Sequence, residues 1–230
     1  MKPAARAALI WSPVVLVISA ATGFGLTSLT QPMVSNRYFL WIIGRGSGLA
    51  AYVTIATLCL LGLWLRHPWR LRWPILHPET TLRLHAALGA STVVLLASHL
   101  ISLALDKYAG VGWKGVFVPN AATYRPFAVS IGVICLYVIL AIIVTARLGA
   151  RLIGRRWLLV HQLSLPAFGA VFCHGVLAGT DTPALKVGYV VTGAMVVGLF
   201  ITRRFARPAV APIRSEGVIA ESMVSSASAP

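Results

Sequence analysis

Six apolar stretches, each about long enough to cross a bilayer, constrain the fold of this chain more than any other feature. A spanning helix needs about 20 mostly apolar residues. Lipid offers no partner for backbone polar groups, so each stretch is predicted to be helical, and no segment alternates as barrel strands do. The predicted fold is all-α, a polytopic membrane protein whose residues 1–206 form a six-helix bundle. The predicted spans cover approximately residues 7–29, 40–65, 84–105, 126–145, 157–177 and 184–201.

The composition excludes a soluble globular domain. Of the 230 residues, 58% are hydrophobic and 11% are charged, against roughly half and about a quarter in soluble domains. In a soluble chain, a net charge of +15 would suggest a nucleic-acid partner. In a membrane protein, basic residues instead set the orientation in the bilayer, so we expect no nucleic-acid partner. Residues 207–230 carry too few apolar side chains for a core and are predicted to be a disordered cytoplasmic tail.

The basic residues predict the orientation. The side of the membrane with more Lys and Arg is normally cytoplasmic, which places both termini in the cytoplasm and predicts a multi-pass protein of the plasma or inner membrane. The cytoplasmic side receives 14 basic residues: Lys2, Arg6, Arg66, Arg70, Arg72, Arg83, Arg147, Arg151, Arg155, Arg156, Arg203, Arg204, Arg207 and Arg214. The outer side receives the other six: Arg37, Arg45, Lys107, Lys114, Arg125 and Lys186.

The third and fifth spans each carry a histidine near both ends. His85 and His99 are 14 positions apart, and His161 and His174 are 13 apart, which is about 21 and 20 Å along an ideal helix. Both spans cross the membrane in the same direction. His85 therefore shares a depth with His161, and His99 shares a depth with His174, so the sequence predicts two cross-helix pairs.

These pairs suit haem. Imidazole binds haem iron, copper, zinc or nickel, and one imidazole from each helix would give a six-coordinate b-type haem. Two depths then predict two b-type haems, with the four histidines as axial ligands and no catalytic residue assigned. A non-haem metal site and a structural role in interhelical hydrogen bonds are the alternatives.

Helix phase fits the third span more easily than the fifth. A separation of 14 residues returns to within about 40° of the starting direction, whereas 13 residues leave His174 about 140° from His161 on a straight helix. Pro166 lies between them, removes one backbone hydrogen bond and can kink or rewind the helix. Such a kink would permit both histidines to face the same side of the span.

From about Gly44 to Arg204 the sequence resembles the ferric reductase-like transmembrane superfamily, the membrane portion of ferric reductases and NADPH oxidases. The haem subunit of the bacterial periplasmic methionine sulfoxide reductase system is a related protein. Besides the paired histidines, the resemblance rests on four motifs: GRGSGLAAY from Gly44, YRPF from Tyr124, LIGRRWLLVHQ from Leu152 and CHGVLAGTDT from Cys173.

The resemblance implies a six-helix bundle with two b haems that carries single electrons from the cytoplasmic to the outer face. His85 and His161 would hold the inner haem, and His99 and His174 the outer one. The sulfoxide reductase subunits are similar but lack a counterpart of His85, so this chain is nearer the two-haem pattern. We identify no flavin or nicotinamide site, and we therefore expect a separate electron donor on the cytoplasmic side or in the membrane, a flavoprotein or a quinol.

Several charged and aromatic residues outside the histidine pairs have competing interpretations. Arg45 and Arg125 face the outer side, where each suits either a haem propionate or outer headgroups. The Asp106–Arg125 loop suits a cap over the outer haem, an acceptor site or an interfacial anchor. His67 and His77 have no partner at a matching spacing and are expected to be solvated.

Two classes of function follow. The first is a transmembrane haem electron conduit, either a ferric reductase-like oxidoreductase acting on an outer acceptor such as ferric iron or oxygen, or a subunit that supplies a partner enzyme on the outer side. The second is a membrane transporter or sensor for copper or a similar metal that uses the same histidines. The absence of acidic residues from the spans disfavours a proton-coupled pump.

Overall fold

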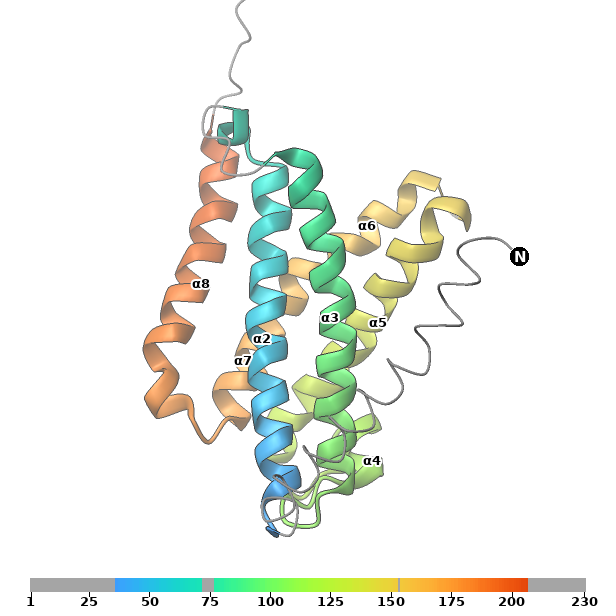
Figure 1. Ribbon diagram of the computed structural model, residues 1–230, viewed down its shortest axis with the longest axis vertical. Helices are drawn as coiled ribbons and strands as arrows, with labels where there is room; N and C mark the ends of the chain where they lie inside the picture. Colours follow the sequence, from blue (N-terminus) through green and yellow to red (C-terminus); the bar gives the residue numbers. More distant parts are fainter. Residues whose placement is uncertain (1–35, 72–76, 153, 207–230) are drawn as a thin grey trace, which may run out of the picture.

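The protein is described here by a computed structural model covering residues 36–71, 77–152 and 154–206. All regular elements in these ranges are helical (Figure 1), which confirms the all-α prediction. Within the described ranges, five stretches of helix are long and apolar enough to cross a membrane, as expected of a multi-pass membrane protein. The predicted first span, 7–29, and the predicted tail, 207–230, lie outside the described residues.

The observed helices match the predicted spans closely, with longer ends. Proline occupies the first turn of α3 and α8 and the first position of α5, where its missing N–H costs no hydrogen bond. The helices are α2 (Phe39–Leu65), α3 (Pro78–Leu105), α4 (Gly112–Phe117), α5 (Pro126–Leu152), α6 (Trp157–His161), α7 (Ser164–Ala178) and α8 (Thr182–Phe205), with short 3-10 turns at Pro68–Leu71 and Gly154–Arg156.

Helix α2 is the centre of the described bundle. It runs along most of α3 and also packs on α7 and α8, while α5 packs along α7. The buried core between α2, α7 and α8 includes Tyr52, Phe168 and Tyr189. By contrast, α3 makes only sparse contact with α5 and α7. Helix α3, which carries His85 and His99, is therefore packed mainly on α2 rather than on α7, which carries His174.

The fifth predicted span is interrupted next to Pro166. Helix α6 ends at His161 and α7 begins at Ser164, with a turn at Gln162 and Leu163 between them. The interruption lies where a proline acts, because its ring clashes with the carbonyl four residues earlier, here that of Gln162. The amide of Leu163 bonds the Val160 carbonyl instead, at 3.0 Å, which tightens the turn.

His67 is buried, so the expectation that it is solvated is wrong. Its ring stacks on Trp64, with the centroids 5.9 Å apart, and Nε2 lies 3.2 Å from Thr202 Oγ1 on α8. Nδ1 accepts a hydrogen bond from the Trp69 amide. The sequence pattern missed this role because the partner on α8 is 135 residues away. His77, at the start of α3, is exposed.

Candidate haem site

One end of the bundle brings His85 and His161 together. His85 lies in the first third of α3 and His161 is the last residue of α6, and their ring centroids are 6.1 Å apart. The Nδ1 atoms of both rings are buried, and neither has a hydrogen-bond partner among the described residues. The structure therefore brings these two imidazoles together at one end of the bundle.

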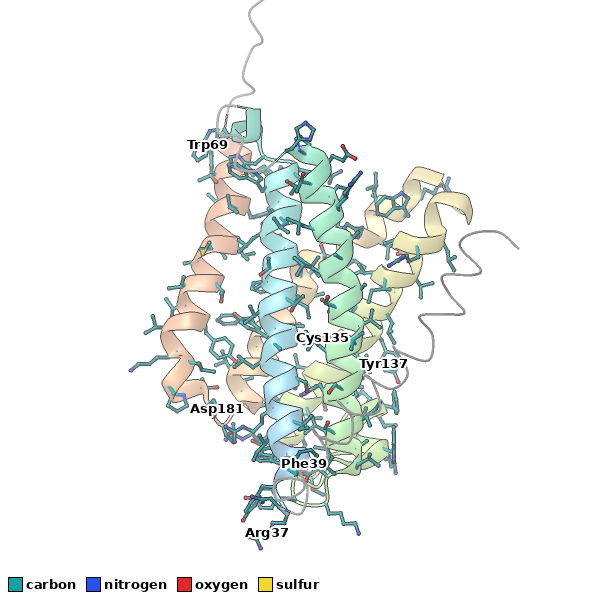
Figure 2. The ribbon with its side chains drawn as sticks, viewed as in Figure 1. Arg37, Phe39, Trp69, Cys135, Tyr137 and Asp181 are labelled. Carbon is teal, nitrogen blue, oxygen red and sulfur yellow. The ribbon has the colours of Figure 1, made fainter. Side chains whose placement is uncertain are left out.

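Toward the other end of the bundle, His99 and His174 line one cavity. His99 reaches it from α3 and His174 from α7, and most other lining residues are apolar or small, among them Val133 and Cys135 of α5. Figure 2 shows Cys135 within the bundle. The cavity also extends to Asp181, at the turn between α7 and α8. His85 and His161 are not among its lining residues.

Backbone carbonyls fix the orientation of both rings in this cavity. Nδ1 of His99 donates to the Gly44 carbonyl at 2.6 Å, and Nδ1 of His174 donates to the Ala128 carbonyl at 2.7 Å. A carbonyl can only accept, so in each ring the proton is on Nδ1. Nε2 then keeps its lone pair, which is the state in which imidazole binds a metal.

A glycine one turn beyond each of these carbonyls makes room for the ring. A Cβ built on Gly48 would lie 2.6 Å from His99 Nδ1, and one on Gly132 would lie 2.7 Å from the His174 ring. Real Cβ atoms do not approach other atoms this closely, so no other residue type fits at either position without a shift. The accepting carbonyl and the glycine four residues later form the same cradle on α2 and on α5.

Helix α2 also places a glycine at the level of His85. Gly62 lies against the His85 ring, with a built Cβ 3.5 Å from Cε1, which is ordinary contact. Gly48 and Gly62 are 14 residues apart, as are His85 and His99. Because α2 and α3 are antiparallel and in close contact, the two glycines meet the two histidines in one register.

Arg45 is paired with an acidic residue at the edge of the cavity. Its Nε donates to Asp181 Oδ2 at 3.0 Å, and Nη2 contacts Oδ1. The guanidinium holds the pKa of the Asp181 carboxyl below its usual value, mainly through this hydrogen bond. Both side chains are partly exposed and both residues line the cavity. Arg45 therefore faces the His99–His174 cavity, with one carboxylate already bound to it.

Arg125 is placed differently. Its Nη1 donates to the Leu177 carbonyl at 2.6 Å, and the neighbouring Tyr124 hydroxyl donates to the Ala178 carbonyl at 2.9 Å. These are carbonyls of the last turn of α7, which have no partner within the helix. Tyr124 lines the cavity but Arg125 does not. Arg125 therefore caps the helix that carries His174.

Each histidine pair offers two imidazole ligands, and haem iron is one of the metals that imidazole binds. The centroids of the His85 and His161 rings are 6.1 Å apart, and the ring planes are at 63° to each other. Among the described residues, no three His, Cys, Asp or Glu side chains converge as a metal site. Two axial imidazoles suffice only where a macrocycle supplies the other ligands.

The residues that sequence reasoning missed are Gly48, Gly62, Gly132 and Asp181. One signal for the first two was present, namely the shared 14-residue spacing of the glycines on α2 and the histidines on α3. Gly89 of α3 lies open, with nothing within 4 Å of a built Cβ. No local signal connects Arg45 to Asp181, 136 residues away.

Comparison with known proteins adds no assignment: no protein-family model, no curated protein and no solved structure matches the chain.

Proposed function

We propose that this protein binds two b-type haems and carries electrons across a cell membrane. His85 and His161 would hold one haem, and His99 and His174 the other. The observation that carries this proposal is the presence of two imidazole pairs, at opposite ends of α3, between helices that scarcely touch. The resemblance to the ferric reductase-like superfamily supports the same function.

The protein's own residues prepare the His99–His174 pair for axial ligation. The carbonyls of Gly44 and Ala128 set the tautomer and raise the basicity of Nε2. Arg45, whose planar group has five N–H donors, can bind a propionate while it keeps Asp181. When bound, haem supplies one-electron redox chemistry, which none of these side chains has at accessible potential.

The charge distribution supports a direction and a donor. Described basic residues at the His85–His161 end include Arg66, Arg83, Arg147, Arg203 and Arg204. A positive surface at the entry side would steer an acidic flavoprotein, whereas a quinol would arrive through the lipid. The acceptor would lie on the outer side, where Arg45 and Asp181 border the cavity, and would be ferric iron, oxygen or a partner enzyme.

The absorption spectrum of the purified protein tests this function. We expect a strong Soret band, an α band after dithionite reduction, and a pyridine haemochrome of the b type. A colourless protein that binds copper or zinc through the same histidines would contradict the haem proposal and favour the transporter or sensor. Exchange of each histidine for alanine then assigns the ligands under either outcome.

A further inference from the structure

The Asp106–Arg125 segment lies against the side of α5 rather than beyond its end. The Tyr137 hydroxyl donates to the Phe117 carbonyl at 2.7 Å, and the Asn120 amide donates to Ser130 Oγ at 2.7 Å. Tyr137 is 11 residues into α5, about 16 Å along the axis. Figure 1 shows α4 beside α3 and α5, and Figure 2 shows Tyr137 toward the same edge of the bundle.

This position is at the depth of the His99–His174 cavity. His174 contacts Ala128 and Gly132 of α5, so Ser130 is at the level of that ring and Tyr137 is farther into the bundle. The contacts to Phe117 and Asn120 therefore bring irregular backbone into the part of α5 that is long and apolar enough to span a membrane.

Several of the segment's backbone polar groups have local partners, which irregular backbone needs where water is excluded. Asp106 Oδ2 accepts from the Ala109 amide at 2.7 Å, and Thr123 Oγ1 donates to the Gly110 carbonyl at 2.8 Å. Together with the bonds from Tyr137 and to Ser130, these contacts satisfy groups that water would satisfy in an ordinary surface loop.

The segment has one buried face and one exposed aromatic face. Val111 and Val116 are buried and line the His99–His174 cavity. On the opposite face Trp113 and Phe117 stack, with their ring centroids 6.4 Å apart. They are 53% and 44% exposed, beside further exposed apolar side chains at Val118 and Phe127. Such an aromatic face is typical of the border between headgroups and acyl chains.

We propose that the Asp106–Arg125 segment is inserted into the lipid leaflet at this end of the bundle, with acyl chains of the bilayer against Trp113, Phe117 and Val118. Its other face separates the His99–His174 cavity from that lipid. The exposed Lys114 extends its charge to the headgroups from the same short helix. This inference concerns lipid contact and does not depend on haem.

Spin labels test the insertion in the full-length protein reconstituted in phosphatidylcholine vesicles. Phe117→Cys and Val118→Cys are labelled separately in a Cys173→Ser background, because Cys173 is the exposed cysteine among those present. Val94→Cys, at a 69% exposed position in the middle of α3, is the lipid reference. Asn36→Cys, exposed before α2 begins, is the water reference.

The readout is the collision rate of each label with oxygen, which concentrates in lipid, and with a water-soluble nickel chelate. We expect the labels at 117 and 118 to resemble the label at 94, with several-fold more collision with oxygen than with nickel. Labels that collide with nickel as the label at 36 does would overturn the proposal, because the aromatic face would then lie in water. The two positions guard against one variant failing to fold.

Discussion

The Gly44 carbonyl of α2 accepts a 2.6 Å hydrogen bond from Nδ1 of His99 on α3. One turn farther along α2, Gly48 leaves room for the His99 ring. The same device recurs at His174, with Ala128 and Gly132 on α5. Both imidazoles are thus oriented by main-chain atoms, which move less than side chains. Loss of a hydrogen bond that orients a metal-binding imidazole commonly lowers metal affinity by about 10–100-fold.

Gly48→Ala should displace the His99 ring. The new Cβ would lie 2.6–2.7 Å from two ring atoms, and overpacking of this kind costs about 1–3 kcal/mol. We expect loss of one bound haem, measured as haem per chain. Gly46→Ala is the matched control, because nothing lies within 4 Å of its built Cβ. Gly62→Ala should also be tolerated, since its Cβ would make ordinary contact with His85. Equal loss in all three variants would contradict the cradle.

Asp181→Asn should remove the carboxylate charge that makes the contact with Arg45 sensitive to acid. The pKa of the folded Asp181 is lowered from its usual 3.8, so this contribution to stability is present above about pH 3.8 and is lost as the pH falls through the folded value. Partly exposed pairs contribute about 0–1 kcal/mol. We expect melting curves of the variant and the wild type to differ slightly at pH 7 and to converge as the pH falls below the pKa of Asp181 in the folded protein. A difference that grew on acidification would contradict the pairing.

His67 should make the α2–α8 contact sensitive to mild acid. Burial, with nearby Arg203 as the smaller cause, lowers the pKa of this imidazole below its usual 6.5. The neutral ring therefore contributes stability fully above about pH 6.5, and that stability is lost as the pH falls through the folded value. His67→Asn should reduce the difference between the free energies of unfolding at pH 5 and pH 7.5. The exposed His77→Asn is the control, and an equal reduction in that variant would count against His67 as the source.

A fusion of a reporter to the C-terminus tests the orientation inferred from 14 basic residues on one side and six on the other. Alkaline phosphatase, which is active only after export, should be inactive there, whereas a fluorescent protein that matures only in the cytoplasm should be bright. The reverse pattern would exchange the inner and outer assignments of the two haem sites and with them the direction of electron flow.

The sequence predicts those features of the fold that depend only on hydropathy and helix geometry within a single segment. The apolar lengths predicted six spans, and the five that lie within the described residues are helical. Pro166 marked the place where the span that carries His161 and His174 is interrupted. Contacts between distant segments were not predictable in this way. The Arg45–Asp181 pair, the capping of α7 by Arg125 and the burial of His67 all depend on which helices become neighbours.

Haem per chain, measured by pyridine haemochrome against protein concentration, tests the central claim most directly. We predict two haems in the wild type and about one in each single alanine variant of His85, His161, His99 and His174. The remaining spectrum should be shared by His85→Ala and His161→Ala, and a different one by His99→Ala and His174→Ala. No haem, one haem in the wild type, or shared spectra that pair the histidines otherwise would contradict the account.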